Sequence, residues 1–205
     1  DTRADDSADD NASTGHGPHP GTGRATRGDD STARHAPPHS CVVFRCPPPQ
    51  EAEAAALLDL SAPLFERSPV RSVATDRRTS STATLGGRHA KHWAVQIVRD
   101  RISAFSGYEL GMLEPLQVVR YHPGEKYENH HDSFDLCDFE QRPRRHLTFL
   151  IYLNDLPGGG AGHTSFPRLN LQLEPKARMA LVFNDVLDNG QDDERTEHAG
   201  NAPAR

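Results

Sequence analysis

The chain has 205 residues, which is enough for one ordinary domain and too few for two large ones. Hydrophobic residues make up 35% of it and charged residues 25%, and the formal net charge of −6 gives no reason to expect nucleic acid or an anionic membrane as a partner. No run of about 18 apolar residues occurs, which excludes a membrane-spanning helix from this sequence. The three cysteines lack the paired close spacing of a disulfide framework or a zinc cluster.

The first part of the chain differs sharply in composition from the rest. Residues 1–40 are rich in Asp, Gly, Ser, Thr, Pro and His and contain almost no large apolar side chain. Such a segment cannot bury enough surface to offset its chain entropy, so we predict disorder over residues 1–40 and a folded domain over residues 41–205. Because the chain begins with Asp1 rather than Met, we expect a processed product, in which a missing signal peptide says nothing about secretion.

Two helices are expected early in the domain, after a short apolar strand at Cys41–Phe44. Glu51–Leu60 has acidic residues in its first turn, and Ala54, Leu57 and Leu58 share one face, which predicts a core-facing helix. A polar stretch from Ser68 to Gly87 follows, over which no element is predicted. The second helix is expected over about His92–Phe105, ending before Gly107, with a core-facing stripe made of Trp93, Ile97, Ile102 and Phe105.

After Gly107 the pattern changes to short, dense apolar runs separated by Pro and Gly. The run Leu-Thr-Phe-Leu-Ile-Tyr-Leu-Asn is too apolar to lie at a solvated edge of a sheet. The predicted strands are Leu113–Tyr121, Leu147–Asn154, Thr164–Phe166, Leu169–Leu173 and Met179–Asn184. Two helices followed by many short strands predict an α+β chain whose main body is a β-sandwich or barrel.

The segment Tyr-Glu-Asn-His-His-Asp contains the strongest candidate for a metal site. On a strand, residues i and i+2 point to the same face, so His130 and Asp132 are expected to project together. One imidazole and one carboxylate make half of a site for a divalent transition metal, and a distant histidine would complete a facial triad with open positions. The candidates for that third ligand are His146, His163 and His198. We favour His198, because it lies beyond the last strong strand, next to a glycine.

Several motifs, in order, give the chain a family resemblance. Glu114–Asp132 resembles the first half of the prolyl 4-hydroxylase catalytic domain, and Arg145–Asn154 is similar to its central strand. Further similar elements are the Arg-Thr-Ser of residues 78–80, the glycine turn and Thr-x-Phe-Pro of residues 158–167, the strand region of residues 173–183, and the His-Ala-Gly of residues 198–200. The resemblance covers roughly residues 41–203, and the preserved order of the motifs makes it more specific than any one of them.

The resemblance implies a double-stranded β-helix (jelly-roll) core with flanking N-terminal helices. It implies Fe(II) bound by His130, Asp132 and His198, 2-oxoglutarate as co-substrate, and ascorbate as reductant. The implied reaction is hydroxylation of peptidyl proline at C4, with a proline-containing peptide as substrate. The implied roles of the other site residues are contact with 2-oxoglutarate for Tyr121 and Thr164, and contact with the peptide for Tyr127 and Arg145. The endoplasmic reticulum lumen is the compartment that the resemblance suggests.

Two departures from the family pattern bear on these expectations. The family has a Gly-Glu-Thr element where this chain has Gly-Ala-Gly-His-Thr, which leaves His163 unexplained. The family also has a lysine beyond the distal histidine, whereas this sequence stops at Arg205, so we expect the last strand of the jelly roll to be missing. A truncated enzyme and a metal-binding relic with weak co-substrate affinity both fit that expectation, because an unpaired buried carboxylate costs several kcal/mol. A nucleic-acid demethylase and a non-catalytic jelly-roll protein remain alternatives.

Overall fold

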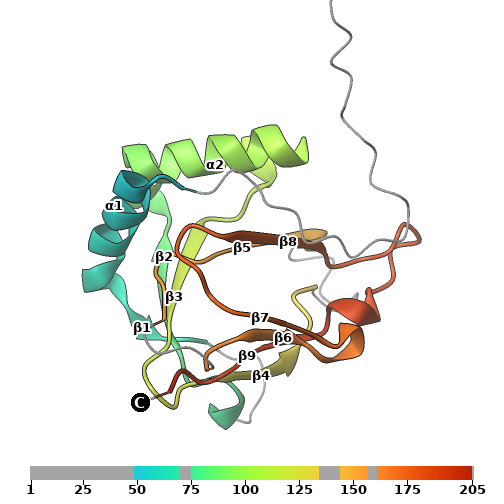
Figure 1. Cartoon of the computed structure of the whole chain (residues 1–205). Helices are drawn as coiled ribbons and strands as arrows, with labels where there is room; N and C mark the ends of the chain where they lie inside the picture. Colours follow the sequence, from blue (N-terminus) through green and yellow to red (C-terminus); the bar gives the residue numbers. More distant parts are fainter. Residues whose placement is uncertain (1–48, 70–74, 134–143, 157–160, 205) are drawn as a thin grey trace, which may run out of the picture. The chain divides into compact units, whose positions relative to one another are not determined.

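The computed structural model describes residues 49–69, 75–133, 144–156 and 161–204 (Figure 1). All of these belong to one unit, which spans residues 36–205. The predicted strand Cys41–Phe44 and the predicted disordered segment 1–40 lie outside the described residues, so the boundary at residue 40 stays a prediction. Within the described part, no helix combines the length and the apolar character that crossing a bilayer requires.

Both predicted helices are confirmed. Helix α1 spans Glu51–Ser61. The carboxylate of Glu53 accepts a hydrogen bond of 2.7 Å from the backbone N–H of Gln50, so the N–H group of the residue before the helix has a partner. Helix α2 spans Trp93–Ser106 and ends at Gly107, whose φ of 76° is the left-handed conformation in which glycine commonly stops helices. Short 3-10 turns connect the elements at Ala62–Leu64, Thr75–Arg77, Gly87–Lys91, Leu110–Met112, Pro167–Leu169 and Glu194–Thr196.

The predicted core-facing stripe of α2 is wrong in part. Trp93, Ile97 and Phe105 are 47%, 39% and 40% exposed, and only Ile102 of the predicted stripe is buried. The rest of the buried face consists of the smaller side chains of Ala94, Val95 and Val98. The helical period of 3.6 residues is compatible with the predicted face and with the observed face of α2. The small side chains of the observed face allow the helix to approach its neighbours more closely. Leu58 of α1 is likewise 39% exposed, so it does not share the buried face of Leu57.

Nine strands form three antiparallel sheets among the described residues. The sheet orders are β1-β2-β3, β4-β9-β6-β7 and β5-β8. The strands are β1 Glu66–Arg67, β2 Ser81–Leu85, β3 Leu116–Arg120, β4 Tyr127–His130, β5 Leu147–Ile151, β6 Thr164–Phe166, β7 Leu171–Leu173, β8 Ala180–Asn184 and β9 His198–Gly200. The predicted α+β class is therefore confirmed as a mixture of helices and antiparallel sheets.

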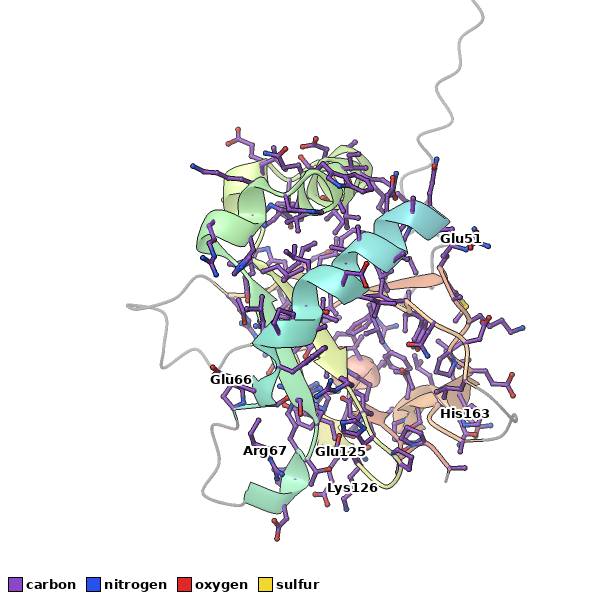
Figure 2. All side chains as sticks on the ribbon, turned by 90° about the vertical axis from the view of Figure 1, so that its left-hand side faces the viewer. Glu51, Glu66, Arg67, Glu125, Lys126 and His163 are labelled. Carbon is purple, nitrogen blue, oxygen red and sulfur yellow. The ribbon has the colours of Figure 1, made fainter. Side chains whose placement is uncertain are left out.

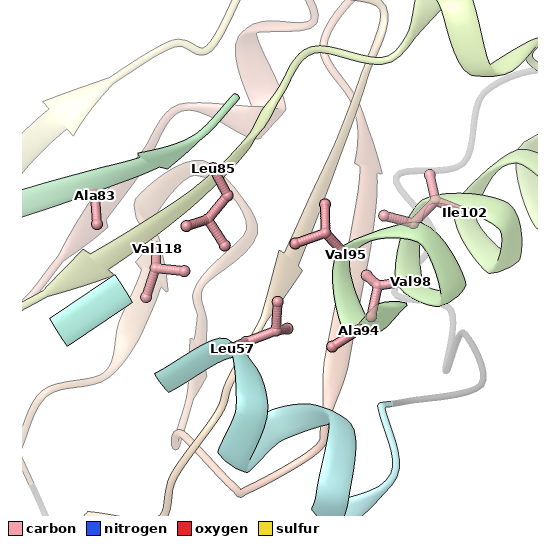
Figure 3. Close-up of a cluster of buried hydrophobic side chains, with 8 residues drawn as sticks. All are labelled: Leu57, Ala83, Leu85, Ala94, Val95, Val98, Ile102 and Val118. Atoms are coloured by element: carbon pink, nitrogen blue, oxygen red, sulfur yellow. The ribbon is translucent and has the colours of Figure 1, made fainter. Parts of the chain in front are cut away.

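Strand β2 was not predicted, because its sequence Ser-Thr-Ala-Thr-Leu lies in a stretch that is polar overall. It is nevertheless the middle strand of its sheet, and Ala83 and Leu85 are completely buried. These two side chains join Leu57 of α1, Val118 of β3 and the buried face of α2 in the largest apolar cluster (Figure 3). The helices thus pack on the β1-β2-β3 side of the unit, away from the histidines of the predicted site.

The β5–β8 pair separates two apolar layers. On one face, Phe149 and Val182 pack in clusters that extend toward the helices. On the other face, Leu181 and Phe183 of β8 meet Phe166 of β6. Figure 1 shows β5 and β8 lying opposite the β4-β9-β6-β7 sheet. Between the two sheets, Phe183 of β8 packs against Phe166 of β6 and His198 of β9. The predicted site lies in this space.

A candidate metal centre between two sheets

The structure brings His130, Asp132 and His198 together, although His198 lies far from the other two in sequence. Strands β4 and β9 are paired antiparallel, with His130 directly opposite His198. One ligand atom from each of the three residues lies within 4.8 Å of the others. The Asp132 carboxylate is 3.6 Å from Nε2 of His130 and 3.7 Å from Nε2 of His198. The predicted convergence is confirmed as geometry, and the role of these residues as metal ligands stays a prediction.

Backbone carbonyls orient both imidazole rings. Nδ1 of His130 lies 2.8 Å from the carbonyl oxygen of Glu128, and Nδ1 of His198 lies 2.9 Å from that of Thr196. A carbonyl oxygen can only accept, so each Nδ1 carries the hydrogen and donates it. Each Nε2 is then left with a lone pair, and both Nε2 atoms face Asp132. This is the arrangement in which histidines bind metals in proteins.

Aromatic rings hold His198 from two sides. Its ring stacks at 29° on Phe166, with centroids 5.4 Å apart, and meets Phe183 edge-on at 66° and 5.0 Å. His198 is only 6% exposed. Burial lowers the pKa of its imidazole, although the neighbouring charge of Asp132 opposes that shift. His198 is therefore kept as a neutral ring, the form that can donate a lone pair.

Asp132 is ionised in this environment. Burial by itself would raise the pKa of its carboxyl, but the polar groups around it, among them the hydroxyl of Thr148, lower it, and the net shift is downward. The hydroxyl of Thr148 also approaches Oδ2 of Asp132 at 2.9 Å. Two imidazoles and one carboxylate on one side of a point are the donor set that suits non-haem Fe(II). The residues present therefore fit an iron ion.

The two residues predicted to contact 2-oxoglutarate lie around Gly200, close to the histidines. Thr164 of β6 is opposite Gly200 in the register of β6 and β9. A Cβ placed on Gly200 would come within 2.9 Å of the Tyr121 hydroxyl, so the lack of a side chain there leaves room for this phenol. Burial raises the pKa of Tyr121, which keeps its hydroxyl protonated and able to donate. Both residues thus lie near the strand that contains His198, and their contact with the co-substrate stays a prediction.

Tyr127 and Arg145, the predicted peptide contacts, also border the three residues. The ring of Tyr127 stacks on His130 with centroids 3.5 Å apart at 15°, and the guanidinium of Arg78 lies 4.6 Å from the same ring. Arg145 forms two hydrogen bonds with Glu114, of 2.5 and 2.8 Å, and its third nitrogen lies 3.4 Å from the backbone oxygen of Asp132. The structure shows an ion pair for Arg145, and contact with a peptide stays a prediction.

The other histidines near the motifs point elsewhere. His163 pairs with Glu174 at 3.8 Å and is labelled in Figure 2, and His146 lies 3.4 Å from the Tyr108 hydroxyl. His131 faces Glu194 at 3.9 Å instead of the Asp132 side, as its alternation with His130 predicted. One detail of the prediction is wrong: β4 ends at His130, so Asp132 lies just beyond the strand rather than on it.

Three neighbours of the site were missed by the sequence analysis as functional candidates. Tyr152 donates a hydrogen bond of 2.7 Å to Thr164, and Thr148 and Asp185 lie behind Asp132. Asp185 directly follows the apolar strand β8, and an acidic residue at that place in the sequence is the signal that could have drawn attention to it. Thr148 and Tyr152 are ordinary strand residues by type, and only the fold reveals their partners.

Comparison with known proteins shows which family the chain resembles. A sequence model of the 2OG-Fe(II) oxygenase superfamily matches residues 116–204, which include all three candidate ligands. The chain is 32% identical over 155 residues to "Probable prolyl 4-hydroxylase 11" of Arabidopsis thaliana, which covers 69% of this chain and 52% of that protein. It is 30% identical over 161 residues to the prolyl 4-hydroxylase subunit alpha-1 of Rattus norvegicus, covering 73% and 29%.

A solved structure shares the fold. The viral collagen prolyl hydroxylase of Paramecium bursaria Chlorella virus-1, determined as a 2OG complex, superposes with a TM-score of 0.61 at 22% identity, over 76% of this chain and 84% of that one. Residues 116–204 are thus similar to the 2OG-Fe(II) oxygenase superfamily. The relatives that the chain resembles along most of its own length are prolyl 4-hydroxylases. The chain spans about half the length of the Arabidopsis relative and less than a third of the rat one.

Proposed function

We propose that this chain is an Fe(II)- and 2-oxoglutarate-dependent dioxygenase that hydroxylates peptidyl proline at C4. The observation that carries the proposal is the meeting of two Nε2 lone pairs and one carboxylate, each held in place by hydrogen bonds on its far side. The similarity to prolyl 4-hydroxylases supports proline as the residue modified. Bound iron and 2-oxoglutarate would supply oxygen activation coupled to decarboxylation, which releases succinate and CO₂.

The chain's own residues would bind and orient the reactants. His130, Asp132 and His198 would occupy one side of the iron and leave the other side open to co-substrate and dioxygen. The hydroxyls of Tyr121 and Thr164 would donate hydrogen bonds to a carboxylate of 2-oxoglutarate. Tyr152 supports this role, because Thr164 accepts its hydrogen and keeps its own hydrogen for another acceptor.

Access for a peptide is supported by a surface depression beside the site. It has a volume of about 410 Å³ and runs along β4 and β9. Tyr127 and Gly200 both line it, and Tyr127 connects it to the proposed centre by stacking on His130, although none of the three proposed ligands lines the depression itself. Lys126 of the same depression is labelled in Figure 2 and lies just before β4. Arg145, on the Asp132 side, would orient a peptide carbonyl.

The finer features of the fold and the remaining cofactor are also proposals. We propose that β5–β8 and β4-β9-β6-β7 are the two faces of a jelly roll, which their facing arrangement and the similarity to the viral hydroxylase support (Figure 1). Ascorbate as reductant and the endoplasmic reticulum lumen as compartment rest on the family resemblance. The lysine expected beyond His198 stays a prediction.

Turnover of a proline-rich peptide tests the proposal. The purified chain would be incubated with Fe(II), 2-oxoglutarate, ascorbate and the peptide, and succinate release would be measured together with the mass of the peptide. We expect one added oxygen atom on proline for each succinate formed. The matched pair of variants is His198→Ala, which should abolish both products, and His163→Ala, which should retain them because His163 lies outside the triad.

Three results would contradict the proposal. Equal turnover by His198→Ala and the wild type would exclude this triad as the metal site. Oxidation of a methylated oligonucleotide, with no peptide product, would identify a nucleic-acid demethylase instead. Metal binding without any succinate release would identify a non-catalytic metal-binding protein.

A further inference from the structure

A buried carboxyl group lies behind the proposed metal centre. Asp185 is only 1% exposed, and it follows the last residue of β8. Its two oxygens lie 3.0 and 3.3 Å from the hydroxyl of Thr148. That same hydroxyl is 2.9 Å from Oδ2 of Asp132. Burying a carboxyl in an apolar layer is costly unless its polar atoms find partners, so the position of Asp185 requires an explanation.

The strand register explains why these groups meet. Thr148 of β5 is directly opposite Phe183 of β8, so the two side chains are on the same face of the pair. Asp185 is two residues beyond Phe183 and its backbone N–H bonds to the carbonyl of His146, which continues the ladder and puts its side chain on that face too. This is the face that packs toward Phe166 and the proposed ligands. The sheet thus presents Thr148 and Asp185 together to Asp132.

The number of hydrogens on each group determines which group donates and which accepts in this contact. The Thr148 hydroxyl has one hydrogen and can accept others on its oxygen. Asp132 is an ionised acceptor, so the Thr148 hydrogen is best donated to it. The Thr148 oxygen can then accept a hydrogen from Asp185 when that carboxyl is neutral. Asp185 is 1% exposed, and burial in an apolar layer favours the neutral form of a carboxyl.

We propose that Thr148 and Asp185 are positioning residues for Asp132, in which Asp185 fixes the hydroxyl of Thr148 and that hydroxyl fixes the carboxylate against the two histidines. This inference rests on the proposed function, because it assigns Thr148 and Asp185 to the support of the same metal centre. Neither residue faces the histidines directly in the contacts described, and both act through Asp132. Such supporting contacts typically change metal affinity by about 10- to 100-fold when they are removed.

Co(II) affinity tests the proposal without requiring turnover. Isothermal titration of the whole chain with Co(II) gives the affinity, and the visible absorption of bound Co(II) reports the geometry of its ligands. Thr148→Val removes the hydroxyl at nearly constant volume, and we expect about 10- to 100-fold weaker binding with an altered spectrum. Thr148→Ser keeps the hydroxyl and should bind like the wild type. Thr84→Val, on the exposed side of β2, is the matched control and should change neither readout.

A second pair of variants tests Asp185. Asp185→Asn retains an N–H that can donate to Thr148, so its Co(II) affinity should remain close to the wild-type value. Asp185→Leu is of similar size but has no donor, so it should bind more weakly than Asp185→Asn. If Thr148→Val does not fold, as judged by its circular dichroism and thermal melt, this second pair decides: equal affinities for Asp185→Asn and Asp185→Leu overturn the proposal.

The remaining outcomes separate this inference from the proposed function. If the wild type binds Co(II) and Thr148→Val binds it equally well with the same spectrum, the positioning role is overturned and the metal centre stands. If Thr148→Ser is as weak as Thr148→Val, the effect is one of packing, and the positioning role is again overturned. If the wild type binds no Co(II), the metal centre and the positioning role are both overturned.

Discussion

Replacing Phe183 with leucine should weaken both the fold and the metal site. Phe183 is 2% exposed and makes two edge-to-face ring contacts, with Phe166 at 5.3 Å and with His198 at 5.0 Å. Each such pair contributes about 0.5–1.5 kcal/mol beyond the burial of area, so Phe183→Leu should lose about 1–3 kcal/mol of unfolding free energy from these contacts. For a chain of this size each kcal/mol corresponds to about 2–4 °C, which predicts a fall in Tm of about 2–12 °C.

The same substitution should also reduce metal affinity, because Phe183 helps to hold the ring of His198 with its Nε2 toward Asp132. We expect about tenfold weaker Co(II) binding, the lower end of the range for residues that orient a ligand. The assay is a thermal melt of the metal-free chain together with a Co(II) titration. The control is Phe149→Leu, since Phe149 makes its ring contact with Phe105, on the helix side of β5–β8. An equal change in Co(II) affinity for both variants would refute the role of the aromatic contacts in holding His198.

Three further predictions concern other parts of the molecule. Saturation with Co(II) at a hundredfold excess over Kd should stabilise the wild type by about 2.7 kcal/mol, or about 5–11 °C in Tm, and a similar rise in His198→Ala would contradict the triad. Tyr121→Phe should raise the KM for 2-oxoglutarate by about tenfold through the loss of one hydrogen bond to a charged group, whereas an unchanged KM would remove Tyr121 from the co-substrate site. Glu53→Ala should lower the free energy of unfolding, measured by chemical denaturation, by about 3 kcal/mol. The reason is that the Glu53 side chain is 8% exposed and accepts two hydrogen bonds from Arg101. A loss below about 1 kcal/mol would contradict a strong contribution from this pair. The hydrogen bonds from Arg101 lower the pKa of Glu53, so this stabilisation should be complete above the ordinary glutamate pKa and should disappear as the pH falls through the lowered value.

Strands β5, β6 and β8, which pack around the site, were predictable, because their apolar runs are dense and are bounded by Pro and Gly. Strands β4 and β9, which contain His130 and His198, have no such run and are not among the strands predicted from apolar runs. Thr164–Phe166 was predicted with its observed bounds, and β8 differs from its prediction by one residue at its start. Strand β2 was not predictable in the same way: its alternation of Ser, Thr and Ala is too polar to indicate a buried central strand. Its burial results from the helices that cover it, which is tertiary context that no local pattern contains.

The face of α2 shows another limit of sequence reasoning. The period of 3.6 residues is compatible with a stripe through Trp93 and Ile97 and with one through Ala94 and Val98. Large side chains suggested the first stripe, and the structure has the second, because small residues allow closer packing against α1 and β2. Hydrophobic size alone therefore did not identify the buried face.

The three candidate ligands were identified for two different reasons. The spacing of His130 and Asp132 is local, so it could be recognised directly from the sequence. The third position depended on the pairing of β4 with β9, and residue spacing alone left His146 and His163 as candidates beside His198. The groups that orient the ligands, such as the carbonyls of Glu128 and Thr196, are backbone atoms and have no sequence signature.

The most direct test of the central claim is a crystal structure of the chain with Mn(II) and 2-oxoglutarate, prepared without oxygen. We predict one Mn(II) ion bonded to Nε2 of His130, Nε2 of His198 and a carboxylate oxygen of Asp132, with 2-oxoglutarate on the opposite side, near Tyr121 and Thr164. A metal ion bound elsewhere, or a site in which His198 is not a ligand, would contradict the account.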